Sequence, residues 1–155
     1  MMEDRTMQIR RILVPTDFSE PSKQAIAYAF ELAQTFEATL VLLHVIEELP
    51  PYITFIPPEE TTKALEDLDC RARLDLAQVA PQAQDGKVGV TCQAVVGAPA
   101  PKIIEVAQEM KADMIVIATH GRTGYRHFVM GSVAEHVVRT APCPVLTIRS
   151  TAMDV

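Results

Sequence analysis

Residues 114–139 read MIVIATHGRTGYRHFVMGSVAEHVVR, and this stretch decides the fold. It opens with five apolar residues, Met114 to Ala118, which have the length and composition of a strand buried in a parallel sheet. After Ser132, apolar residues recur at helical spacing, at Val133, Val137 and Val138. A loop that contains Gly121, Gly124 and Gly131 joins the two elements. Glycine amides that lead into a helix N-terminus form a site suited to phosphate.

The local charge of this loop is opposite in sign to the net charge of the chain. The whole chain carries a formal net charge of -6, yet no acidic residue occurs between Asp113 and Glu135. Two arginines and two histidines fall within this interval: His120, Arg122, Arg126 and His127. A local excess of positive charge in an acidic chain favours a site for an anion.

Two common phosphate motifs are absent, because the chain has neither G-x-x-x-x-G-K-[ST] nor G-x-G-x-x-G. The loop instead resembles the ATP-binding branch of the universal stress protein family, in which Gly, two residues, Gly, nine residues and Gly-Ser or Gly-Thr follow the fourth strand. The corresponding residues here are Ala118, Thr119-His120, Gly121, the nine residues 122–130, and Gly131-Ser132. Ala118 replaces the first glycine, and its methyl could crowd a ligand or strain a backbone that needs positive φ. The resemblance extends from Arg11 to Ile148.

Composition narrows the possible classes of protein. A chain of 155 residues with 48% hydrophobic residues is expected to form one domain over 1–155, with 1–8 as a loose N-terminal tail. A pI near 5.2 argues against nucleic-acid binding, and no apolar run is long enough to cross a membrane. The N-terminus lacks the apolar centre of a signal peptide, which indicates a cytoplasmic protein. Cys70, Cys92 and Cys143 form no C-x-x-C, so we expect reduced thiols and no metal site.

Strands and helices are predicted to alternate along the whole chain. The expected strands are 12–14, 40–46, 88–96, 114–118 and 145–148, and the expected helices are 19–36, 59–80, a short one near 103–107, and one after Ser132. This alternation predicts an α/β fold, a single doubly wound five-stranded parallel sheet with helices on both faces. The resemblance implies the strand order 3-2-1-4-5. Ligands of such sheets bind where the order reverses, so Asp17 and Gly121 should be neighbours.

The resemblance also implies a nucleotide site with two ends. The nucleoside end would comprise Pro15, Thr16, Asp17 and Val45, with Asp17 accepting hydrogen bonds from the ribose or the adenine amino group and Val45 offering backbone groups to the adenine edge. The phosphate end would comprise Ala118, Thr119, His120, Gly121, Arg122, Gly131, Ser132 and Val133. The implied ligand is ATP, with Mg²⁺ or Mn²⁺ on its phosphates. Asp17 could instead only cap the helix that begins near Ser19.

Three functions remain open from the sequence. The first is an ATP-binding stress-response regulator or nucleotide-dependent switch, and the second is a weak ATPase or nucleotide-transferring enzyme on the same site. The third is a nucleotide-free dimerisation module, which the Gly-x9-Gly-Ser element disfavours. No catalytic residues are identified, because the chain shows no Ser-His-Asp order and no paired acids, which favours a binding protein over an enzyme. His44 is expected to be a hydrogen-bonded core histidine, and the proline-rich 47–58 either a lid or a plain loop.

The last predicted strand, Val145, Leu146, Thr147 and Ile148, would lie at one edge of the sheet. An exposed apolar edge invites pairing with another chain, and Arg149 supplies the only charge beside it. We therefore expect a homodimer through this strand, as the resemblance also implies. The alternative is an edge covered by residues 150–155.

Overall fold

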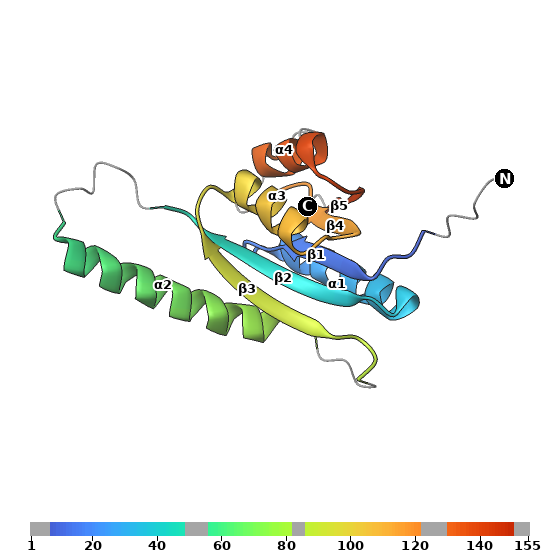
Figure 1. Ribbon diagram of the computed structural model, residues 1–155, viewed down its shortest axis with the longest axis horizontal. Coiled ribbons are helices and arrows are strands. Elements are labelled where there is room, and N and C mark those ends of the chain that lie inside the picture. Colours follow the sequence, from blue (N-terminus) through green and yellow to red (C-terminus); the bar gives the residue numbers. More distant parts are fainter. Residues whose placement is uncertain (1–6, 49–55, 82–85, 122–129, 151–155) are drawn as a thin grey trace, which may run out of the picture.

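The computed structural model describes residues 7–48, 56–81, 86–121 and 130–150 of the chain, and these form a five-stranded sheet with four helices (Figure 1). Along the chain the elements are β1 (Arg11–Pro15), α1 (Glu20–Phe36), β2 (Thr39–Ile46), α2 (Pro58–Val79), β3 (Val90–Val96), α3 (Pro99–Glu109), β4 (Met114–Ala118), α4 (Ser132–Thr140) and β5 (Val145–Ile148). The strands are all parallel, in the order β3-β2-β1-β4-β5. The predicted fold class and strand order are confirmed.

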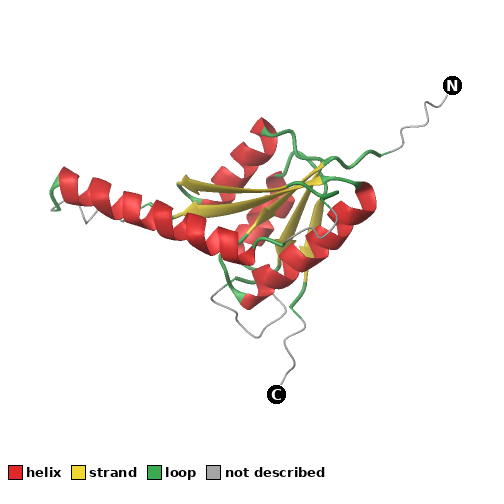
Figure 2. Ribbon diagram, turned by 90° about the horizontal axis from the view of Figure 1, so that it is seen from below, coloured by secondary structure: helices red, strands yellow, loops and turns green. Residues whose placement is uncertain are grey.

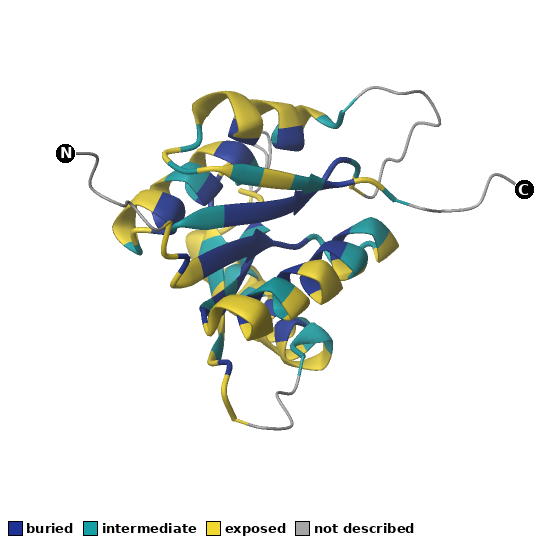
Figure 3. Ribbon diagram, turned by 90° about the vertical axis from the view of Figure 1, so that its right-hand side faces the viewer, coloured by how far each residue is buried: buried dark blue, intermediate teal, exposed yellow. Residues whose placement is uncertain are grey.

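Helices cover both faces of the sheet, and alternate residues of each central strand point to opposite faces. Ile12 and Val14 of β1 belong to the core cluster beneath α1 and α2, whereas Leu13 belongs to the cluster beneath α3 and α4. The three side chains are fully buried. Figure 3 shows the buried residues concentrated on the strands and on the inner sides of the helices. Burial on both faces explains why these strands read as continuous apolar runs.

Helix α2 carries one apolar stripe that is buried over only part of its length. The stripe consists of Leu65, Leu68, Ala72, Leu76 and Val79, and of these only Ala72 and Leu76 are buried. Leu68 remains 39% exposed. The reason is geometric: the N-terminal half of α2 projects beyond the sheet, as Figure 2 shows, so the sheet has no surface beneath that half of the stripe.

The two edges of the sheet are β3 and β5. Apolar residues alternate along 88–96, at Val88, Val90, Cys92, Ala94 and Val96, a pattern that indicates a strand near a sheet edge, and β3 is such a strand. Several predictions lie outside the described residues: the loose tail over 1–6, most of the proline-rich segment, and the loop 122–129 with Arg122, Arg126 and His127. Among the helices of the described ranges, none is long and apolar enough to cross a membrane.

Candidate functional site

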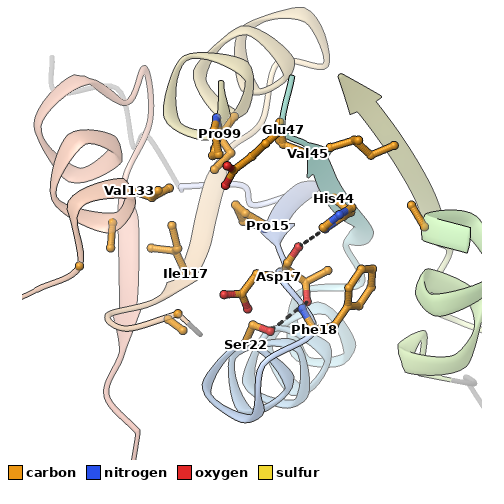
Figure 4. Close-up of a pocket in the computed structure, with 18 of the residues that line it drawn as sticks. Pro15, Asp17, Phe18, Ser22, His44, Val45, Glu47, Pro99, Ile117 and Val133 are labelled. Atoms are coloured by element: carbon orange, nitrogen blue, oxygen red, sulfur yellow. Dashed lines mark hydrogen bonds between the residues drawn. The ribbon is translucent and has the colours of Figure 1, made fainter. Parts of the chain in front are cut away.

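A cleft of about 730 Å³ opens at the carboxyl ends of β1 and β4, where the strand order reverses. Its size lies within the roughly 300–1,000 Å³ of small-molecule sites. Figure 4 shows Asp17, Val45, Ile117 and Val133 facing it from four different elements of the chain. The residues of the predicted site that the structure describes all line this cleft: Pro15, Thr16, Asp17, Val45, Ala118, Thr119, His120, Gly121, Gly131, Ser132 and Val133. Arg122 lies outside the described residues.

Thr16 anchors the turn between β1 and α1. Its amide continues the parallel ladder by donating to the carbonyl oxygen of Leu43, 2.8 Å away. Its side chain is buried, and Oγ1 accepts a hydrogen bond from the amide of Phe18 at 3.1 Å. Oγ1 also lies 3.0 Å from Oγ of Ser22, so the hydroxyl ties the turn to the first turn of α1. The sequence predicted Thr16 as a site residue, and the contacts show how it shapes the loop.

Asp17 divides its two carboxylate oxygens between two tasks. Oδ1 accepts hydrogen bonds from the amide of Ser19, at 3.0 Å, and from its hydroxyl. Ser19 is itself the N-cap of α1, so Oδ1 of Asp17 supports the residue that begins this helix. Oδ2 instead faces Gly121 across the cleft: a Cβ added to Gly121 would lie 2.5 Å from it. Gly121 therefore makes room for the Asp17 carboxylate.

The predicted phosphate end is built from backbone groups. Gly131 donates its amide to the carbonyl oxygen of Thr119 at 2.7 Å, and its own carbonyl accepts from Glu135 in the first turn of α4. A Cβ on Gly131 would lie 3.2 Å from the Thr119 carbonyl oxygen, so the two segments approach closely. Gly131 is the N-cap of α4 and contributes no side-chain cap. The first amides of α4, those of Ser132 and Val133, are thus available to an anion at a positive helix end.

The backbone of Val45 presents its hydrogen-bonding groups to the cleft. Leu43 bonds to the β1 side of β2, through Thr16, and Ile46 bonds to the β3 side, through the amide of Gly97. Because residues of a parallel strand alternate between neighbours, Val45 directs its amide and carbonyl toward the β1 side. Pairing of β1 with β2 ends at Pro15 and Leu43, so β1 has no partner for Val45 there. A planar base with a donor and an acceptor on one edge suits this position.

Several lining residues escaped the sequence reasoning. His44 was predicted to be hydrogen-bonded in the core, and its Nδ1 does lie 2.8 Å from the Thr16 carbonyl, but the ring also forms part of the cleft wall. Glu47 and Pro99 close the rim above Val45 (Figure 4). A third group comes from α2: Leu68, Arg71, Ala72 and Asp75. The proximity of His44 and Glu47 to Val45 in the sequence could have identified them as lining residues. Nothing in the sequence indicated that α2 lies over the cleft.

Within the described ranges, no three His, Cys, Asp or Glu side chains form a group that could hold a metal ion. His120 lines the cleft with Nδ1 3.0 Å from the hydroxyl of Thr119. The cysteines do not line the cleft. Burial raises the pKa of the Cys92 thiol, and burial together with the Asp113 carboxylate raises the pKa of the Cys143 thiol, so both stay protonated at neutral pH.

Comparison with known proteins places this geometry in a family. Residues 8–149 match the model of the universal stress protein family. Universal stress protein MJ0531 of Methanocaldococcus jannaschii is 33% identical over 141 residues, which cover 90% of this chain and 82% of that protein. The solved structure of MJ0577 from the same organism has a TM-score of 0.82 at 27% identity and covers 94% of this chain and 99% of its own.

A second solved structure, which is 21% identical, has the same fold. It is the universal stress protein from Archaeoglobus fulgidus in complex with dAMP, with a TM-score of 0.58, and it covers 91% of this chain and 98% of its own. The family model spans nearly the whole chain, and the fold, the strand order and the curated relatives agree with it. The chain belongs to the universal stress protein family.

Proposed function

We propose that this protein binds an adenine nucleotide, ATP with Mg²⁺ or Mn²⁺ on its phosphates, in the cleft at the ends of β1 and β4. The observation that carries the proposal is the approach of Asp17 to Gly121, which brings the nucleoside end and the phosphate end into one cavity. The complex of a family member with dAMP supports the choice of adenine. The outward-facing backbone of Val45 gives a physical basis for it, since adenine carries a donor and an acceptor on one edge.

The proposed role is that of a cytoplasmic regulator whose conformation or partner affinity depends on the bound nucleotide. The described lining residues supply groups suited to binding, namely carboxylates, backbone amides and an apolar wall. Weak hydrolysis of ATP on the same site is the competing function. Released phosphate, measured with pure protein, ATP and Mg²⁺, separates the two.

Calorimetry tests the binding itself. We expect saturable binding of ATP with Mg²⁺, and weaker binding of AMP, because helix-terminal amides and a loop without acids favour the longer phosphate chain. Mass spectrometry of small molecules that remain bound through purification would identify the physiological nucleotide. Absence of any heat at millimolar ATP would overturn the proposal.

We also propose a homodimer through β5. Pro144 and Ile148 direct their carbonyls to β4, where they accept from Ile115 and Thr119, so alternation directs Val145 and Thr147 outward. The outward groups form an open edge, and Leu146 on the same short strand is 37% exposed. A second copy, related by a two-fold axis and pairing antiparallel, would cover this edge.

Thr147→Pro tests this dimer, because it removes an amide that points outward. We expect the variant to shift toward monomer in light scattering across a dilution series, while the unmodified protein remains dimeric at tens of micromolar. Cys92→Pro on β3 is the matched control, since alternation also directs its amide away from the sheet, at the opposite edge. A monomeric unmodified protein, or equal dissociation by both variants, would rule out β5 as the interface.

A further inference from the structure

The turn between β1 and α1 holds a residue in a strained conformation. Among the described residues other than glycine, positive φ occurs at Phe18, Glu37 and Lys111. Glu37 is the C-cap of α1, and Lys111 follows the C-cap of α3, which are ordinary places for this conformation. Phe18, with φ of 64°, ends no helix. A bulky residue is strained in this region, and such strain persists only where surrounding contacts enforce it.

Two side chains outside the turn supply those contacts. His44 lies on β2, and its Nδ1 is 2.8 Å from the carbonyl oxygen of Thr16. Since a carbonyl only accepts, Nδ1 carries the proton and donates it. The imidazole ring also packs on the ring of Phe18, with centroids 4.5 Å apart. His44 therefore contacts the turn on both sides of Asp17: it bonds to the backbone of Thr16 and packs on the side chain of Phe18.

Ser22, in the first turn of α1, makes further hydrogen bonds to the same turn. Its hydroxyl is buried, lies 3.0 Å from Oγ1 of Thr16, and is 2.9 Å from the carbonyl of Ser19. Thr16 Oγ1 in turn receives the amide of Phe18. These bonds hold the residues on either side of Asp17. The Asp17 carboxylate itself is bonded by Ser19 and lies against Gly121.

We propose that His44 is a positioning residue for the ligand: with Ser22 it holds Phe18 in the left-handed conformation, which sets the Asp17 carboxylate at the nucleoside end before ligand arrives. The inference rests on the proposed nucleotide site and assigns a specific task to a histidine that the sequence presents as part of the core. A preset carboxylate avoids the cost of ordering the turn on binding. Loss of His44 should therefore weaken the nucleoside contact and leave the phosphate contacts largely intact.

The test compares His44→Leu with His44→Asn. Leucine fills the space without a donor, whereas the asparagine amide can still donate to the Thr16 carbonyl. We expect His44→Leu to weaken adenosine and ATP by about tenfold, the effect of one hydrogen bond together with the ordering of the turn. His44→Asn should recover most of that loss. Thr35→Val is the control, because it removes a hydroxyl-to-carbonyl bond on the exposed side of α1.

A double-mutant cycle separates positioning from general destabilisation. In an Asp17→Ala background, His44→Leu should change adenosine affinity by less than about twofold, because the carboxylate that it positions is gone. Equal loss in both backgrounds would overturn the proposal, as would failure of His44→Asn to rescue binding. Thermal unfolding of each variant shows whether it is folded.

Amide hydrogen exchange gives a readout that needs no nucleotide. The amide of Phe18, which bonds to Thr16, should exchange faster in His44→Leu and recover in His44→Asn, while core amides of β1 stay protected. Unchanged exchange at Phe18 would show that His44 does not hold the turn. If the unmodified protein bound neither adenosine nor ATP, the proposed function would be wrong. The exchange rate of the Phe18 amide would then decide by itself whether His44 holds the turn.

Discussion

The two ends of the cleft are built in opposite ways. The turn at the nucleoside end is held by side chains, with Thr16, Ser22 and His44 making hydrogen bonds around Asp17. The described part of the predicted phosphate end is held by backbone groups. It needs glycine at positions 121 and 131, because a Cβ at either position would crowd a neighbouring oxygen atom. This difference predicts which substitutions weaken ligand binding at each end. Binding at the nucleoside end should weaken when a polar side chain is removed, and binding at the phosphate end when a side chain is added to a glycine.

The largest effect is expected from Gly131→Val. Gly131 has a φ of -60°, so valine is not excluded by the backbone angle, but its Cβ would crowd the Thr119 carbonyl at 3.2 Å. The branched side chain must displace the start of α4, whose amides are proposed to bind phosphate. We expect ATP to weaken about 100-fold, roughly 2.7 kcal/mol, and adenosine less than about threefold, by calorimetry.

Gly89→Val is the matched control for Gly131→Val. An added Cβ at Gly89 would meet only the side chain of Thr39, at 3.7 Å, in ordinary contact. This variant should bind both ligands normally. Equal losses of ATP and adenosine in Gly131→Val, with the fold intact by thermal unfolding, would show that the phosphate end does not act as a separate unit.

A smaller effect is expected where the two ends touch. Gly121→Ala places a methyl 2.5 Å from Oδ2 of Asp17, so the carboxylate must move. Because Asp17 is proposed to bind the nucleoside, the variant should weaken ATP and adenosine alike, by about tenfold, and so should Asp17→Ala. In the double variant the methyl meets no carboxylate, so the two losses should not add. Additive losses would mean that Gly121 acts through its own amide.

The fold was predictable because its signals are local and repeated. Apolar runs such as Leu40 to Ile46 identify buried strands, and the alternation of elements leaves few topologies. The strand order came from the resemblance, because nothing in a strand's own residues names its neighbour. The projecting half of α2 was not predictable: Leu65 and Leu68 repeat at core spacing, yet their exposure depends on where the sheet ends.

The position of the site could be predicted from the sequence, but the contacts within it could not. Glycine spacing and the position of Asp17 after the first strand located the cleft. Which group each residue contacts was hidden, because Phe18, Ser22 and His44 are brought together by three separate elements. The role of Gly121 is an example. The sequence indicated a backbone amide for phosphate, while the structure adds that the missing Cβ accommodates a carboxylate from the other end.

The smallest effect is expected at Ala118, which replaces the first glycine of the family pattern. Of the two effects considered for its methyl, strain at a positive φ does not arise, because Ala118 ends β4, pairs with Ile148 and is not among the described residues with positive φ. Its side chain packs in the core beneath α1 and α2, on the face of the sheet opposite α4. The methyl is therefore directed away from the amides proposed to bind phosphate. Ala118→Gly should change ATP affinity by less than about twofold while lowering the free energy of unfolding by about 0.5–1 kcal/mol, as measured by calorimetry and denaturant titration. A gain of tenfold or more in ATP affinity would instead show that the methyl crowds the ligand, and that β4 as well as the loop after it limits the phosphate end.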